Sequence, residues 1–168
     1  MFLKNRWYLA AYSREVTRVA PLGGAFLNAK GALFRTRAGE ALALEDRCPH
    51  RFAPLSVGRM THEGIACGYH GMEFGRDGKC LSNPTQPGEK LHPNACVRAY
   101  PVEERHGMIW IWMGPAATAD GNLIPDWWYY DHPEWRADTQ YMHVNGNYLL
   151  VVDNLLDLSH INFVHEGI

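Results

Sequence analysis

Short segments that alternate hydrophobic and polar residues, or are rich in β-branched and aromatic residues, fill the chain from Trp7 to about Trp112. Gly and Pro separate them at roughly the 8–12-residue spacing of strands in small β-proteins. Examples are GAFLNAK, GALFRTR, EALALED, VRAYPVEER and GMIWIWM. This pattern predicts a mainly β domain, a small antiparallel β-sandwich or barrel.

The pattern changes in the last third of the chain. Residues 113–140 are rich in Pro, Gly, Asp and aromatic residues without a period, and we interpret them as an ordered connector. From Asn147 the sequence YLLVVDNLLDLSHINFV contains no Gly or Pro and is long enough for a helix. Its polar residues share one arc of about 140° on a helical wheel, and nearly all other positions are apolar. These residues are Asp153, Asn154, Asp157, His160 and His165. The pattern predicts a buried helix whose polar arc faces a site.

The composition fits a globular protein and narrows its choice of partners. A chain of 168 residues with 46% hydrophobic residues can bury a proper core. With a formal net charge of −2, the chain lacks the excess of basic residues that binding to nucleic acid or an anionic membrane usually requires. The apolar runs are too short to span a bilayer, and the N-terminus lacks a signal-peptide pattern. We therefore expect a cytoplasmic protein with no nucleic-acid or membrane partner.

The four cysteines are the first chemical signal. Without an export signal, irregularly spaced cysteines favour metal binding or free thiols over a disulfide framework. Two of them lie in similar motifs that also contain His: CPH at 48–50 and, after sixteen residues, CGYH at 67–70. Cys80 and Cys96 lie in apolar or turn contexts where a small buried residue is ordinary, so we assign them no ligand role.

Two Cys and two His at this spacing suit either a tetrahedral zinc ion or an iron–sulfur cluster. Zinc sites usually pair like ligands, whereas each motif here carries one Cys and one His. Two Cys on one iron and two His on the other is the arrangement of a Rieske [2Fe–2S] centre. Gly68 and Gly71 permit a tight backbone around it. The predicted ligands are Cys48, His50, Cys67 and His70. A zinc site, or four unlinked residues, is the alternative.

The C-terminal helix carries a second candidate site. Buried acids and imidazoles must be paired or bound to metal, and two His with a carboxylate form the facial triad of non-haem Fe(II) oxygenases. The candidate residues are Asn154, Asp157, His160 and His165. The alternative is that Asp157 and His160 form only an i, i+3 pair and that His165 lies past the helix end.

Together the two motifs resemble those of the Rieske non-haem iron oxygenases. The segments FLKNRWYLAAYSREV, CPHRFAPLSVG, CGYHGMEF, MIWIWMG and NYLLVVDNLLDLSHINFVH are most similar to oxygenase subunits of the vanillate and dicamba O-demethylase group. The resemblance implies a Rieske domain over residues 1–115. Residues 116–168 would then be a connector and the first helix of an α+β helix-grip catalytic domain. We expect the chain to be a truncated, N-terminal portion of such an oxygenase.

The resemblance also implies roles for single residues. His160 and His165 would be ligands of a mononuclear Fe(II), whose third ligand, a carboxylate, is missing from this chain. Asp157 would bridge, by hydrogen bonds, an iron-ligand His and a cluster-ligand His of the neighbouring subunit. Asn154 would lie near the iron without binding it.

The implied function is that of the oxygenase component of an aromatic monooxygenase. Electrons from NAD(P)H would pass through a separate reductase, carrying flavin and an iron–sulfur cluster, to the [2Fe–2S] centre and the Fe(II). O2 would then be used for O-demethylation or hydroxylation of a small aromatic acid. The intact protein would be a homotrimer, and the 168-residue chain alone would be inactive. The alternatives are a Rieske-type ferredoxin, which would not need residues 141–168, and a structural zinc protein.

Overall fold

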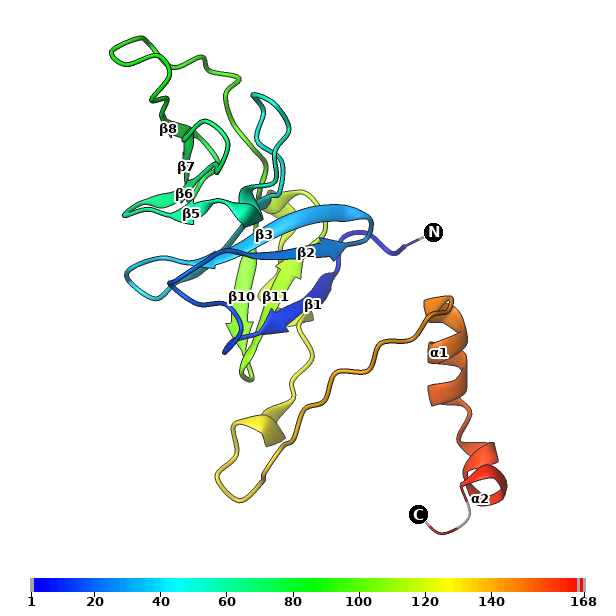
Figure 1. Ribbon diagram of the computed structural model, residues 1–168. Coiled ribbons are helices and arrows are strands. Elements are labelled where there is room, and N and C mark those ends of the chain that lie inside the picture. Colours follow the sequence, from blue (N-terminus) through cyan, green and yellow to red (C-terminus); the bar gives the residue numbers. More distant parts are fainter. Residues whose placement is uncertain (1, 166, 168) are drawn as a thin grey trace. The chain divides into compact units, whose positions relative to one another are not determined.

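The computed structural model describes residues 2–165 and 167 (Figure 1). Its strands all pair antiparallel, in sheets of order β1-β11-β10, β2-β3-β4-β9 and β5-β6-β7-β8. This confirms the mainly β fold expected from the sequence. The strands are β1 (Trp7–Tyr12), β2 (Leu22–Phe26), β3 (Ala29–Arg35), β4 (Ala41–Glu45), β5 (Arg59–Met60), β6 (Gly64–Ala66), β7 (Glu73–Gly75), β8 (Cys80–Ser82), β9 (Ala99–Tyr100), β10 (Val102–Arg105) and β11 (Met108–Trp112).

Strand β11 lies at the centre of the packing because all five of its residues are buried. Ile109 and Ile111 belong to a core that also contains side chains of β2, β3, β4 and β9. The alternate residues of β11 pack on the opposite face, with Trp7 and Ile124. Since successive side chains of a strand point to opposite faces, the sheet β1-β11-β10 is covered on both sides.

The aromatic segment that follows β11 covers the second face of the sheet β1-β11-β10. Trp7 Nε1 donates a hydrogen bond to the Asp120 carbonyl at 2.7 Å, and the Trp110 and Trp127 rings lie 5.2 Å apart. By its contacts the chain divides into two compact units, Met1–Arg136 and Ala137–Ile168. The connector expected at residues 113–140 therefore belongs to the first unit as far as Arg136, and its last four residues belong to the second. The domain boundary at 115 stays a prediction.

A third core joins the sheet β2-β3-β4-β9 to the sheet β5-β6-β7-β8. It contains Phe34 and Leu44 from β3 and β4, Ile65 and Phe74 from β6 and β7, and the thiol of Cys48. The first cysteine of the predicted site is thus fixed within packed apolar side chains.

A bidentate ion pair fastens β3 to β10. The Arg35 guanidinium donates to both Glu104 carboxylate oxygens, at 2.8 and 3.0 Å. By these hydrogen bonds it holds the pKa of the Glu104 carboxyl below its ordinary value. The same guanidinium donates to three carbonyl oxygens, those of Ser13, Val16 and Gly39.

Replacing Glu104 with Gln is expected to lower the free energy of unfolding by about 1 kcal/mol at pH 7. The value is modest because the Glu104 side chain is 39% exposed and water screens the pair. The carboxyl pKa is lowered in the folded state, so its contribution is complete above the unfolded value of about 4.3 and disappears as the pH falls through the folded value. Urea unfolding at pH 7 and at low pH measures both effects. Glu40→Gln, in an exposed pair with Arg76, is the control and should change little.

The C-terminal unit differs from the expected single helix. Helix α1 spans Tyr148–Leu156, a 3-10 turn spans Leu158–His160, and α2 spans Ile161–Val164. The break lies at Asp157, whose backbone is extended at φ −85° and ψ 93°. Its Oδ1 accepts hydrogen bonds from the Ser159 N–H at 2.9 Å and the Ser159 hydroxyl at 2.5 Å. This local cap competes with helix continuation, so the prediction of one helix was wrong.

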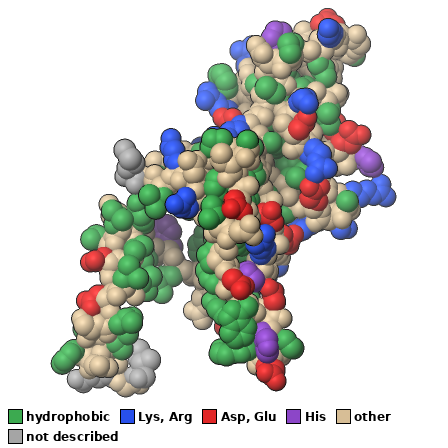
Figure 2. Space-filling model, turned by 180° about the vertical axis from the view of Figure 1, so that it is seen from behind, with side chains coloured by type: hydrophobic (Ala, Val, Ile, Leu, Met, Phe, Trp, Pro, Cys, Tyr) green, Lys and Arg blue, Asp and Glu red, His purple; other side chains and the backbone are tan. Residues whose placement is uncertain are grey.

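The helix expected to be buried is exposed in the part of the chain that the structure describes. Helix α1 has no buried residue, and hydrophobic side chains are exposed on the C-terminal unit (Figure 2). The largest exposures in its helical segments include Leu155, Leu156, Leu158 and Phe163 at 68, 77, 68 and 81%. The physical reason is that, among the described residues, this unit contains no sheet to cover them. No helix in the described ranges has the length and apolar character needed to cross a bilayer.

Candidate metal centres

The loop that carries the first Cys/His motif connects β4 to β5, and we call residues 46–58 the first ligand loop. The Cys48 N–H donates to the Ala53 carbonyl at 2.9 Å, and the Phe52 N–H donates to the Cys48 carbonyl at 2.9 Å. These two bonds close a tight turn, in which Phe52 has a φ of +60°. The turn directs the Cys48 side chain into the core and leaves His50 at the surface.

The second ligand loop, residues 67–72, repeats this turn between β6 and β7. The Cys67 N–H donates to the Met72 carbonyl at 2.8 Å, and the Gly71 N–H donates to the Cys67 carbonyl at 3.0 Å. Gly71 has a φ of +76°, at the position that Phe52 occupies in the first ligand loop. The two loops therefore share one backbone geometry, although His follows Cys by two residues in one and by three in the other.

The two glycines of the second motif act in different ways. Gly71 adopts a left-handed conformation that glycine takes without strain. Gly68 instead allows close packing, because a Cβ there would lie 3.0 Å from the Val57 carbonyl oxygen of the first ligand loop. Both therefore permit the tight backbone expected from the sequence.

The four predicted ligands lie together at the tips of these loops. Cys48 and Cys67 are 2 and 1% exposed, and the His50 and His70 ring centroids are 4.6 Å apart. Burial raises the pKa of the Cys48 thiol, and the hydrogen-bonded Cys67 thiol raises it further. The backbone N–H groups of His50 and Arg51 donate toward the Cys48 sulfur and lower this pKa. Donors of this kind stabilise a thiolate.

The arrangement suits a two-iron cluster better than a single metal ion. Among the described residues, no three His, Cys, Asp or Glu side chains converge as they would around one ion. A structural zinc ion needs four protein ligands on one centre, whereas a Rieske cluster takes two on each iron. Two buried thiols and two outer imidazoles fit the second requirement.

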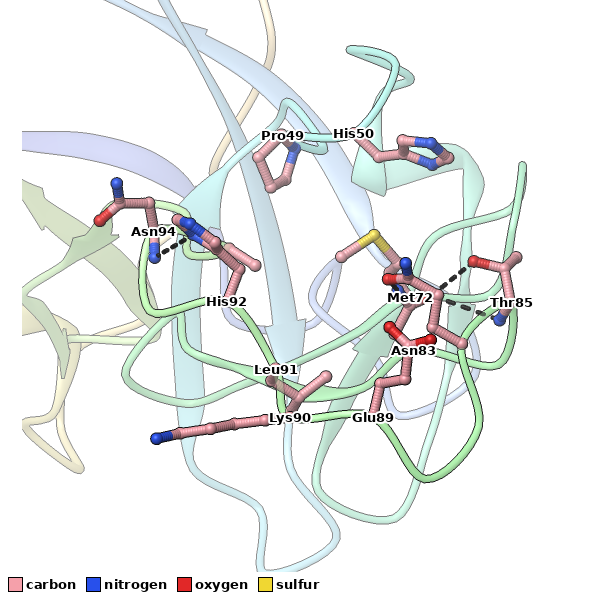
Figure 3. A pocket seen from close by; sticks show the side chains of 12 residues that line it. Pro49, His50, Met72, Asn83, Thr85, Glu89, Lys90, Leu91, His92 and Asn94 are labelled. Carbon is pink, nitrogen blue, oxygen red and sulfur yellow. Dashed lines mark hydrogen bonds between the residues drawn. The ribbon is translucent and has the colours of Figure 1, made fainter.

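The imidazoles have different surroundings. The Tyr69 ring lies against His70, tilted by 34° with the ring centroids 3.9 Å apart. His50 borders a hollow of about 610 Å³ between the first ligand loop and residues 83–95 (Figure 3). The buried Met72 and a set of polar side chains line this hollow, including Asn83, Thr85, Gln86, Lys90 and His92.

The second candidate site is assembled only in part. The His160 and His165 rings lie 5.4 Å apart, and both line a hollow of about 290 Å³ together with Asn154. Asp157 does not line this hollow. Its carboxylate caps the 3-10 turn by accepting hydrogen bonds from Ser159. These bonds, the one from the hydroxyl more than the one from the N–H, lower the pKa of the Asp157 carboxyl. The single polar arc expected from a continuous helix is replaced by two His and one Asn around the hollow, with Asp157 at the helix break.

Sequence reasoning missed two features of the first ligand loop. The Arg47 guanidinium lies 4.0 Å from the centroid of the Phe52 ring, and the Asp46 carboxylate binds Ser56. Superposing the two motifs on their cysteines would have placed Phe52 opposite Gly71 and marked it as a left-handed position. No spacing pattern in the sequence predicts the hydrogen bonds between Asp46 and Ser56.

Comparison with known families places this site in context. The Rieske [2Fe–2S] domain family matches residues 6–101, and the vanillate O-demethylase oxygenase C-terminal domain family matches residues 144–168. The chain is 50% identical over 165 residues to the putative toluene-4-sulfonate monooxygenase system iron-sulfur subunit TsaM2 of Comamonas testosteroni. That alignment covers 98% of this chain and 47% of the relative.

A second relative is the oxygenase component of dicamba O-demethylase from Stenotrophomonas maltophilia, 44% identical over 99% of this chain and 48% of the relative. The crystal structure of dicamba monooxygenase bound to dicamba superposes with a TM-score of 0.91 at 44% identity, over 98% of this chain and 48% of that one. The chain thus spans about half the length of the curated relatives it matches. These relatives are named as subunits or components of multi-component systems. The chain belongs to the Rieske [2Fe–2S] domain family and is similar, along nearly its whole length, to oxygenase components of the vanillate and dicamba O-demethylase group.

Proposed function

We propose that this chain is the cluster-carrying part of the oxygenase component of a Rieske-type aromatic monooxygenase. The observation that carries the proposal is the pair of matching loops, which bring two buried thiols and two outer imidazoles together. The cluster ligands would be Cys48, His50, Cys67 and His70, and His160 and His165 would supply two ligands of a mononuclear Fe(II). When bound, the cluster supplies single electrons and the mononuclear iron supplies O2 activation.

The residues of the chain prepare the first of these sites. Burial of Cys48 and Cys67 excludes water from the thiol side, and the N–H groups that face the Cys48 sulfur stabilise its negative charge. His50 and His70 lie on the outer side, where a partner can approach them. This asymmetry suits an electron-transfer centre with one protected side and one accessible side.

The partners and substrate follow from the relatives. Electrons would come from NAD(P)H through a separate flavin and iron–sulfur reductase, since the relatives are components of multi-component systems. The substrate would be a small aromatic acid that undergoes O-demethylation or hydroxylation, because the relatives are named for toluene-4-sulfonate, vanillate and dicamba. The intact protein would be a homotrimer, and the cytoplasmic location stays a prediction.

Asp157 would link an iron-ligand His of one subunit and a cluster-ligand His of the next. Asp157→Asn in the full-length protein is expected to retain both metals and to reduce turnover by at least about tenfold, or about 1.4 kcal/mol in the barrier. Asn keeps an oxygen that can accept from Ser159, so the 3-10 turn should persist while the charge is lost. Iron and sulfide analysis with steady-state turnover measures both effects.

Asp153→Asn is the matched control, because it removes a nearby acid, in helix α1, that likewise does not line the hollow. It should leave turnover near the wild-type value. Wild-type turnover of the Asp157 variant would refute the bridging role.

A further inference from the structure

The two ligand loops differ in how their ends are held. The second ligand loop is a hairpin, because β6 and β7 pair directly at its base through Ala66 and Glu73. The first ligand loop has no such base. It leaves β4, which pairs with β3 and β9, and enters β5, which pairs with β6 in a different sheet. Something other than strand pairing must fix the positions of Cys48 and His50.

A side-chain clasp takes the place of that pairing. The Asp46 Oδ1 accepts a hydrogen bond from the Ser56 N–H at 2.6 Å, and Oδ2 accepts one from the Ser56 hydroxyl at 2.7 Å. These bonds join the two ends of the first ligand loop across ten residues. The Asp46 N–H also donates to the Lys30 carbonyl at 3.0 Å, so the clasp is anchored to β3.

The clasp is packed on both sides. A Cβ at Gly23 of β2 would lie 2.9 Å from the Ser56 hydroxyl oxygen, so this strand supports the pair directly. Leu55, next to Ser56, is fully buried in the core that contains Cys48 and Cys67. Movement of Ser56 would therefore disturb the side chains that surround the thiols.

Asp46 also brings a negative charge close to the site. It is 8% exposed, and it is the one charged side chain recorded as buried among the described residues. None of the ion pairs among the described residues involves Asp46. A buried carboxylate without a cation persists only where hydrogen bonds satisfy it, as those from Ser56 do here.

We propose that Asp46 is a positioning residue for the cluster: its clasp with Ser56 holds the first ligand loop, and its buried charge lowers the reduction potential. The inference rests on the proposed function, since it assumes a cluster on Cys48 and His50. A fixed negative charge opposes the addition of an electron, and its field is weakly screened in the protein interior. Removing the charge should therefore raise the potential.

The test separates the clasp from the charge with three variants of the 168-residue chain, purified anaerobically with its cluster. Asp46→Ala removes both, Ser56→Ala removes one hydrogen bond, and Asp46→Asn removes the charge while its amide can still bond Ser56. Visible absorbance in the presence of a chelator gives the rate of cluster loss, and a redox titration gives the potential. Glu104→Gln, which weakens a pair between β3 and β10, controls for general destabilisation.

Both alanine variants should lose the cluster faster than the wild type, by about tenfold or more for Asp46→Ala, given the cost of an unsatisfied buried group. Asp46→Asn should lose it near the wild-type rate and show a more positive potential. Wild-type rates in both alanine variants, an equal acceleration in Glu104→Gln, or an unchanged potential in Asp46→Asn would overturn the inference. If Asp46→Ala does not fold, Ser56→Ala decides on the clasp. A wild-type chain that holds no cluster would refute the proposed function itself. If the wild type holds a cluster, the contrary results in the variants refute only the role of Asp46.

Discussion

Replacing Cys48 with Ser is expected to abolish the visible colour of the protein and the EPR signal of its reduced cluster. The thiol is 2% exposed, lies against the Cys67 thiol and receives backbone N–H donors, so the pocket is built for a sulfur anion. A serine hydroxyl does not ionise at neutral pH, and the soft thiolate is the donor that iron–sulfur clusters require. Iron and acid-labile sulfide in the purified variant should fall to background.

Cys80→Ser is the control that the chain offers. The Cys80 thiol is half-buried and donates to the Ser82 carbonyl, a bond that a hydroxyl can also make. That variant should keep its colour and its iron. A Cys48→Ser protein with normal cluster content would mean that the Cys and His motifs do not form the ligand set.

Replacing His160 with Ala in the full-length protein is the second change with a large expected effect. His160 and His165 are the two imidazoles around the C-terminal hollow, and no other His among the described residues lines it. The variant should lose its mononuclear iron and retain the two-iron cluster. Loss of an outer-sphere partner typically reduces metal affinity or activity by about 10–100-fold, so loss of a ligand should reduce turnover by more than about 100-fold.

His143→Ala is the matched control, since the His143 ring contacts Asn145 and does not border the hollow. Metal analysis should find its mononuclear iron unchanged. If His160→Ala leaves iron content and turnover intact, the C-terminal motif binds no iron. A full-length protein that holds only the cluster iron and turns over no substrate would instead favour the alternative, a Rieske-type ferredoxin that only carries electrons.

The cluster loops could be predicted because their information is local. The CPH and CGYH motifs give the candidate Cys and His ligands and their spacing within a few residues, and Gly71 marks the left-handed position of the second turn. The strands could be predicted for the same reason, since β11 alternates Ile and Trp toward two cores. The left-handed conformation of Phe52 was harder to predict, because a glycine such as Gly71 signals a left-handed position in the sequence and a phenylalanine does not.

The remaining features depend on contacts that periodicity does not encode. The helical pattern continues through Asp157, and only the hydrogen bonds to Ser159 show that a cap interrupts it. The burial expected for α1 was inferred from its apolar residues, but burial depends on a covering surface and not on the helix alone. The clasp of Asp46 and Ser56 joins residues ten positions apart in an irregular loop, where no repeat predicts the pairing.

The most direct test of the central claim is a measurement of iron and acid-labile sulfide, with EPR of the dithionite-reduced chain after anaerobic purification. The account predicts about two irons and two sulfides per 168-residue chain, the content of one [2Fe–2S] cluster, and a signal typical of mixed Cys and His ligation. Stoichiometric zinc without sulfide, or a folded chain that binds no metal, would contradict it.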